Sequence, residues 1–76
     1  MNFPDEIRKI RQRLFMTQED FAKEIGVVFS TVNRWEGGKS KPNLSAMKSI
    51  KEYCCNHDMD FSAAEEAWLS YKMEEK

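Results

Sequence analysis

Apolar residues recur at spacings of three and four along the chain, a period that is typical of amphipathic helices. Short polar or glycine-containing stretches separate five such segments, and none of them alternates in the way that predicts a strand. The pattern therefore predicts an all-α fold, a compact five-helix domain, with helices at about 4–14, 18–25, 29–36, 44–55 and 62–75.

The predicted helices each have a buried side, which follows from the same spacing. The expected core residues are Ile7, Ile10, Leu14, Phe21, Ala22, Ile25, Val32, Trp35, Leu44, Met47, Ile50, Cys54, Ala64, Trp68 and Tyr71. In 76 residues this set makes one modest core, so we expect residues 1–76 to form a single domain.

Helix-start signals precede four of the five segments. They are Pro4 with Asp5, Thr17 with Asp20, Asn43, and Ser62 with Glu65. The third segment is the exception, because Val28 stands at the expected N-cap and has no side-chain acceptor. An uncapped start costs about 1 kcal/mol relative to Ser or Thr. We interpret Val28 as buried in the turn.

The second and third helices are short, and Gly26 with two or three further residues separates them. This is the sequence shape of a helix-turn-helix, although many small bundles contain a similar corner. The specific residues favour the first interpretation. The run IRKIRQRLFMTQEDFAKEIGV, followed by STVNRWEGGKSKPN, resembles the Cro and phage-repressor (XRE-like) family, whose fold is lambda-repressor-like. The matching positions are Arg11, Thr17-Gln18, Ala22, Gly26, Thr31-Val32, Arg34-Trp35-Glu36, Gly38 and Pro42.

The resemblance implies a family-like core at 4–56 that binds double-stranded DNA and reads base edges with the third helix. The family's outward positions fall on Phe29, Ser30, Asn33 and Arg34. Arg can donate two hydrogen bonds to guanine, Asn can pair with adenine, and an aromatic ring can cover a thymine methyl. A solvated helix face is the alternative for these residues.

The resemblance also implies residues that hold the DNA backbone and one pair that holds the fold. Phosphate contacts are expected at Gln18, Lys39, Ser40, Lys41 and Asn43, at helix starts and in the loop after the third helix. For the lysines, solubility is the alternative. The family joins Arg11 and Glu36 in a partly buried ion pair, which would fix the third helix rather than read DNA.

The net charge of −1 is unusual for a protein that binds DNA, which normally carries a basic surplus. Residues 1–53 carry ten Lys and Arg against seven Asp and Glu, and residues 54–76 carry two against six. A basic N-terminal part and an acidic C-terminal part can therefore be separated. A rival hypothesis remains: an antitoxin-like or accessory module that docks a second protein through Trp68 and Tyr71, with DNA binding secondary.

Other chemistry finds little support in the sequence. Cys54, Cys55 and His57 lack the spacing and the fourth ligand of a zinc site, and no orienting group suggests a catalytic Cys–His pair. We therefore expect no metal, no cofactor and no enzymatic activity. No segment has the length of a membrane span or the form of a leader, and the adjacent cysteines suit a reducing compartment. We expect a cytoplasmic homodimeric transcriptional regulator, a repressor rather than an activator.

Overall fold

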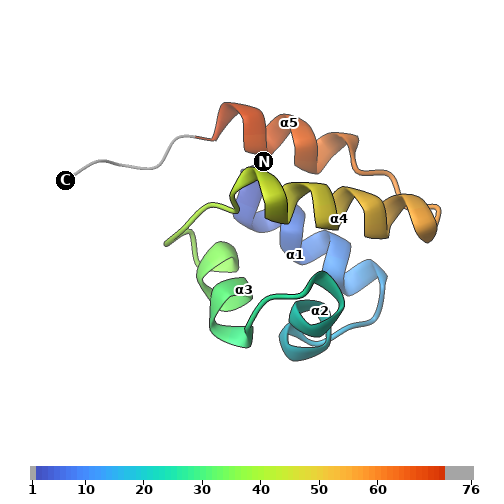
Figure 1. Ribbon diagram of the computed structural model, residues 1–76. Coiled ribbons are helices and arrows are strands. Elements are labelled where there is room, and N and C mark those ends of the chain that lie inside the picture. The colour runs from blue at the N-terminus through green and yellow to red at the C-terminus, as the bar shows by residue number, and fades with distance from the viewer. Residues whose placement is uncertain (1, 72–76) are drawn as a thin grey trace.

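The computed structural model describes residues 2–71, and the described chain forms five helices and no strand (Figure 1). This confirms the predicted all-α fold. The helices are α1 Phe3–Arg13, α2 Gln18–Ile25, α3 Phe29–Glu36, α4 Leu44–Asn56 and α5 Ser62–Ser70.

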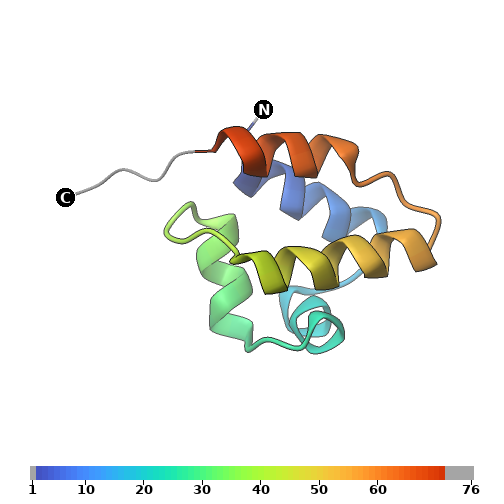
Figure 2. The same cartoon turned by 45° about the horizontal axis from the view of Figure 1, so that its top comes forward.

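Helix α1 lies at the centre of the arrangement. It packs against α3 on one side and α5 on the other, while α2 packs against α3 and α4. Figure 2 shows α5 running beside α1, with α4 in front. The fully buried side chains of Phe3, Ile7, Phe21, Val32 and Ile50 bring all of the first four helices into one core.

One predicted core residue is wrongly placed. Leu44 is the first residue of α4, and its side chain is 66% exposed. The buried side of α4 begins one turn later, at Met47, and continues through Ile50 and Cys54.

Side-chain caps explain where three helices begin. The side chains of Asn2, Thr17 and Asn43 accept hydrogen bonds from the backbone N–H groups of Asp5, Asp20 and Ala46. Val28 is the N-cap of α3 and provides no such bond, as predicted. Its interpretation as a buried turn residue is wrong, since Val28 is 65% exposed.

The start and end of α5 also differ from the prediction. Ser62 is the first helical residue rather than the cap, and its backbone N–H and hydroxyl both donate to Asp60 Oδ1, at 3.0 and 2.8 Å. The helix ends at Ser70, because Tyr71 has an extended backbone (φ −76°, ψ 125°). The rest of the predicted helix, residues 72–75, lies outside the described residues.

Four described residues have a positive φ, in the left-handed backbone region: Phe15, Gly26, Gly38 and Asp58. Gly26 (φ 89°) ends α2, and there a residue without Cβ avoids strain. Phe15 (φ 58°) occupies the same region between α1 and α2 with its ring exposed, and nothing in the structure explains an aromatic residue there. In the part of the chain described here, no helix is both long and apolar enough to cross a membrane.

Candidate nucleic-acid interface

Helix α3 has one buried and one exposed face. Val32 and Trp35 point into the core, and Glu36 is buried beside them at the C-terminal end. All four residues predicted to contact bases are exposed: Phe29, Ser30, Asn33 and Arg34. The structure therefore brings them together on the outer side of one helix. The major groove of B-DNA is wide enough to admit an exposed α-helix.

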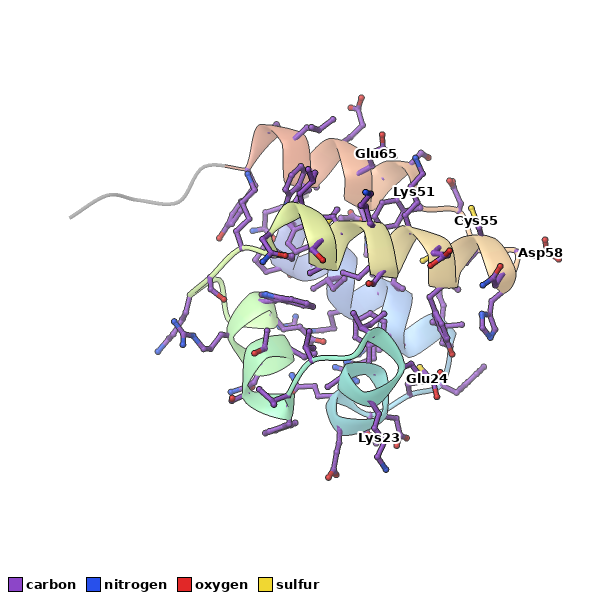
Figure 3. The ribbon with its side chains drawn as sticks, in the orientation of Figure 1. Lys23, Glu24, Lys51, Cys55, Asp58 and Glu65 are labelled. Carbon is purple, nitrogen blue, oxygen red and sulfur yellow. The ribbon has the colours of Figure 1, made fainter. Side chains whose placement is uncertain are left out.

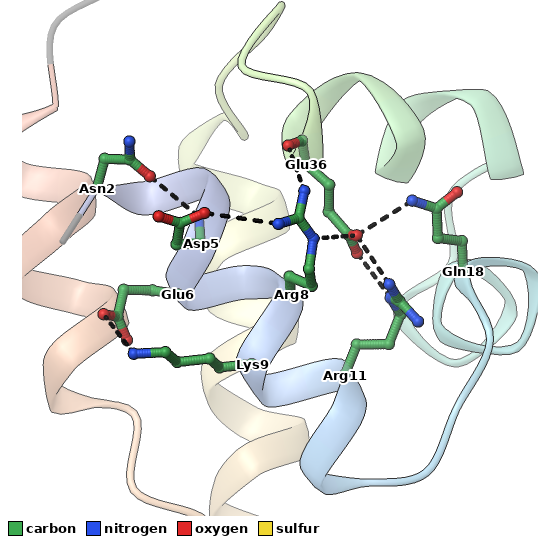
Figure 4. Close-up of polar contacts among 8 residues, drawn as sticks. All are labelled: Asn2, Asp5, Glu6, Arg8, Lys9, Arg11, Gln18 and Glu36. Atoms are coloured by element: carbon green, nitrogen blue, oxygen red, sulfur yellow. Dashed lines mark hydrogen bonds and ion pairs between the residues drawn. The ribbon is translucent and has the colours of Figure 1, made fainter.

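The buried Glu36 carboxylate anchors the C-terminal end of α3 to α1 and α2 (Figure 4). Arg11 holds both oxygens, with Nε 2.7 Å from Oε2 and Nη2 2.9 Å from Oε1. The Gln18 side chain donates to Oε1 at 3.1 Å. Because the Glu36 side chain is only 2% exposed, these bonds replace the water that the charge has lost.

Arg8 is a second cation at this anchor, and the sequence analysis missed it. Its Nη2 donates to the Glu36 backbone carbonyl at 3.2 Å, and its Nε lies 3.6 Å from Glu36 Oε1. Arg8 also bridges to Asp5 at 3.6 Å. The spacing of Arg8 and Arg11 could have indicated this role, because residues three apart in a helix lie on the same face.

The charges around Glu36 set its protonation. Burial raises the pKa of Glu36, but hydrogen bonds from Arg11 and Gln18 and the charges of Arg11 and Arg8 lower it by more. Its pKa therefore lies below the usual value. The hydrogen bond to Glu36 correspondingly raises the pKa of Arg11. The anchor is thus an ion pair at neutral pH.

A hollow of about 320 Å³ lies between α3 and the start of α4. Its polar lining comes from Thr31 and Arg34 on α3, Ser40 and Lys41 in the following loop, and Asn43 at the α4 N-cap. Thr31 was not among the predicted site residues. Donors and a cation at the rim of a hollow, next to a helix N-terminus, suit an anionic phosphate oxygen.

The predicted phosphate-contacting residues have different surroundings. Lys39 and Asn43 are exposed, and Ser40 is half-buried at the hollow. The Gln18 amide nitrogen is directed to Glu36, while the first backbone N–H groups of α2 lack acceptors within the helix. Lys41 turns toward α5, where Nζ donates to the Tyr71 carbonyl at 2.9 Å and lies 4.7 Å from the Trp68 ring centroid.

The two aromatic residues of the rival partner surface are partly buried against the protein itself. The Trp68 indole N–H donates to the Pro42 carbonyl at 2.8 Å. Tyr71 lies near the Phe3 ring, with centroids 6.4 Å apart, and its hydroxyl is 3.5 Å from the Gly38 carbonyl oxygen. Both residues therefore contact the loop after α3.

The cysteine and histidine residues make no candidate centre in the described structure. Cys54 is buried, which raises the pKa of its thiol to about 11 and keeps it protonated. Cys55 points outward from α4 (Figure 3), and the His57 ring nitrogen Nδ1 lies 2.9 Å from the Tyr53 carbonyl oxygen. Within residues 2–71, no three His, Cys, Asp or Glu side chains are grouped to hold a metal ion.

The α2–turn–α3 unit, with a buried anchor and an exposed polar helix face, defines a helix-turn-helix domain of the DNA-binding class. A family profile described as helix-turn-helix matches residues 7–54, and the chain belongs to this family. This confirms the resemblance seen in the sequence.

Two curated proteins are similar to the chain. The HTH-type transcriptional activator BcrR of Enterococcus faecalis is 30% identical over 53 residues, which cover 70% of this chain and 26% of that protein. The type II methyltransferase M.SsoII of Shigella sonnei is 34% identical over 55 residues, or 68% of this chain and 14% of that protein. The chain thus spans a small part of the length of these two relatives. No solved structure matches it significantly.

Proposed function

We propose that the chain regulates transcription by reading the major groove with α3, as a homodimer on a two-part DNA site. The observation that carries this proposal is the division of α3, whose outer face presents Phe29 and Arg34 to solvent while Glu36 is anchored in the protein. A rigidly held helix with exposed polar residues can place them against base edges without reordering the domain.

The exposed residues have complementary chemistry for base recognition. Arg34 would donate to guanine O6 and N7, Asn33 would pair with adenine, and Ser30 would bond to either base. Phe29, which is 51% exposed, would cover a thymine methyl. The exposed part of the Phe29 ring would then be buried against the base when DNA binds.

Phosphate contacts would flank this helix. We assign them to Lys39 and Ser40 in the loop, to the α4 start at Asn43, and to the α2 start at Gln18 through its backbone N–H. Positive helix ends and backbone donors hold phosphate oxygens. Lys41 is left out of this group, because its ammonium donates to the Tyr71 carbonyl. Each phosphate neutralised should contribute about −0.9 to the slope of log affinity against log salt.

Selection of bound sequences from a random duplex pool tests the proposal. Wild type, Arg34→Ala and Arg13→Ala are compared. Arg13 is an exposed arginine in the last turn of α1, and Figure 1 shows that this end of α1 lies away from α3. Wild type and Arg13→Ala should select the same two-fold symmetric motif. Arg34→Ala should lose preference at one position in each half-site, at a cost of about 1–3 kcal/mol. Selection of no motif by the wild type at moderate salt would refute DNA reading.

For the dimer, we propose that a second copy covers the apolar surface formed by Leu44 and Leu69. Both are about two-thirds exposed (66% and 67%), and they flank a hollow of about 230 Å³ that includes Met47, Phe61 and Trp68. Lys48 and Lys51 rim its α4 side and Glu65 its α5 side. Figure 3 shows Lys51 and Glu65 lying together, and their charged atoms are 3.6 Å apart.

Under two-fold symmetry the lysine rim of one copy would face the Glu65 rim of the other, so that opposite charges would meet across the interface. Sedimentation of wild type and Leu69→Glu tests it, with the exposed Ala63→Glu on the same helix as the control. We expect only Leu69→Glu to shift the population to monomer and to abolish preference for paired half-sites. A monomeric wild type that still selects a single half-site would refute the dimer and leave base reading intact.

We propose that the protein represses transcription, because repression requires only that the protein occupies the promoter. A reporter with the selected site overlapping the promoter should be less active when the protein is present. Increased expression from that reporter would refute repression.

A further inference from the structure

We propose that α5 positions the loop between α3 and α4 for the DNA backbone, through Trp68, Tyr71 and Lys41. This inference rests on the proposed function. It assigns the C-terminal helix a role in affinity, since the loop, residues 37–43, carries the expected phosphate contacts Lys39 and Ser40.

Three hydrogen bonds and one cation–π contact join the C-terminal end of α5 to this loop. The Trp68 indole N–H donates to the Pro42 carbonyl at 2.8 Å. The Lys41 ammonium donates to the Tyr71 carbonyl at 2.9 Å and lies 4.7 Å from the Trp68 ring centroid. The third hydrogen bond joins the Tyr71 hydroxyl to the Gly38 carbonyl oxygen, at 3.5 Å. We call these contacts the α5 clasp.

The chemistry of the clasp favours one arrangement of the loop. A Trp indole has a single N–H donor, so its bond selects one position for Pro42, the residue before the Asn43 cap of α4. Lys41 places a cation at the C-terminal end of α5, where the helix dipole and a free carbonyl favour positive charge. Its contact with the indole face adds a cation–π attraction.

The clasp holds the loop on both sides of the phosphate-facing residues. The Tyr71 hydroxyl contacts Gly38, whose φ of 75° lies in the left-handed region that favours glycine. Lys41 and Pro42 are held three and four residues further on. Lys39 and Ser40 therefore lie between two fixed points, beside the hollow that Arg34 also lines.

This arrangement separates the roles of the two loop lysines. Lys39 is exposed, and it is the lysine that contacts phosphate directly. Lys41 is a positioning residue, because its ammonium is bound to the carbonyl of Tyr71 and to the Trp68 ring. The loss of either clasp partner should weaken backbone contacts and leave the choice of bases unchanged.

Trp68→Phe tests the inference, because it removes the indole donor and keeps an aromatic ring. The control is Ala63→Ser, at an exposed position on the first turn of the same helix that belongs neither to the clasp nor to the proposed dimer surface. Affinity for the selected duplex is measured over a range of salt concentrations, well below the melting temperature of each variant. A lost neutral hydrogen bond corresponds to a loss of about tenfold at most, and we expect about five- to tenfold for Trp68→Phe.

The salt dependence and the base preference distinguish positioning from general destabilisation. Trp68→Phe should make the slope of log affinity against log salt shallower by about 0.9, one phosphate contact, while selecting the same bases as wild type. In the free protein, amide hydrogen exchange at Lys39, Ser40 and Lys41 should become faster. Ala63→Ser should match the wild type in affinity, in salt slope and in loop exchange.

Combining Trp68→Phe with Lys41→Met separates positioning from a direct phosphate contact. Positioning predicts that the double variant binds no more weakly than the weaker single variant, since both remove the same support. Additive losses would show that Lys41 contacts phosphate independently, and would overturn its assignment. Unchanged affinity and salt slope in Trp68→Phe would overturn the role of α5. Failure of the wild type to bind DNA would instead refute the proposed function and positioning with it, whereas loop exchange would still report whether the clasp exists.

Discussion

The two ends of α3 are supported very differently. At the C-terminal end, Glu36 receives hydrogen bonds from Arg11 and Gln18 through its carboxylate, and from Arg8 through its backbone carbonyl. At the N-terminal end, Val28 offers no cap and Phe29 is about half exposed. The helix is thus fixed where it meets the protein and open where it would meet DNA.

This difference separates the stability of the domain from recognition. Residues at the Glu36 end act on the orientation of α3, whereas residues at the Val28 end and on the outer face are available to bases. Changes at the first end should therefore lower stability, and changes at the second should alter binding with little loss of folding. Substitutions at the two ends of α3 therefore test this division.

Glu36→Ala should destabilise the domain by about 3 kcal/mol. The substitution leaves Arg11, whose side chain is mostly buried, without its carboxylate partner, and removing one member of a buried pair is costly. Chemical denaturation followed by circular dichroism measures the loss. Arg34→Ala, on the exposed face of the same helix, serves as the control and should change stability by at most about 0.5 kcal/mol. Equal losses in the two variants would contradict the division between the ends.

Acid should remove part of the stability that the Glu36 anchor provides. The folded state lowers the pKa of Glu36 below its ordinary value of 4.5, so on acidification the unfolded chain takes up this proton first. The contribution is therefore complete above about pH 4.5 and is lost as the pH falls through the folded-state pKa. Denaturation curves between about pH 7 and pH 3 should show this loss in wild type.

The matched comparison for acid is Glu36→Gln, which has no carboxylate to titrate at this position. Its stability should fall less steeply below about pH 4.5 than that of wild type. Glu52→Gln, an exposed change on α4, controls for the general effect of removing one acidic residue. If Glu36→Gln and wild type fell in parallel, the carboxylate would not be the titrating support of α3.

The sequence predicted the elements better than it predicted the C-terminal contacts. Caps and apolar spacing gave the observed limits of α2 and α3, because local hydrogen bonds and burial determine short helices of this kind. They failed at Ser62, where Asp60 supplies the acceptor two residues earlier. They also failed at Val28 and Leu44, since periodicity does not tell which apolar residues at helix ends remain exposed.

The candidate site shows the same limit. The exposed positions on α3 follow from helical geometry, and the partners Arg11 and Glu36 came from the family resemblance. The clasp between Trp68 and Pro42 joins residues 26 positions apart, and no local pattern encodes it. The contact between Lys41 and Tyr71 could not be predicted either, because the two residues are far apart in sequence. Their separation gives no sign that the Lys41 ammonium is turned toward α5.

Val28→Ser should stabilise the open end of α3 by about 1 kcal/mol. Serine at an N-cap accepts a hydrogen bond from the second or third backbone N–H of the helix, and little buried area is lost because Val28 is largely exposed. Thermal unfolding measures the gain. Val28→Ala removes the same side chain without adding an acceptor, so it should show no stabilisation. A gain shared by both variants would mean that valine is unfavourable there for a reason other than capping.

Phe29→Ala should have a small effect on folding and a clear effect on DNA binding. Half of the Phe29 surface is exposed, and alanine is a better helix former, so the change in stability should stay within about 1 kcal/mol. Selection from the random duplex pool should then show weaker preference for thymine at one position of each half-site, while the guanine assigned to Arg34 is retained. A large fall in melting temperature with unchanged base preference would instead place the Phe29 ring in the core. The N-terminal end of α3 would then support the fold, as the Glu36 end does, and would not read bases.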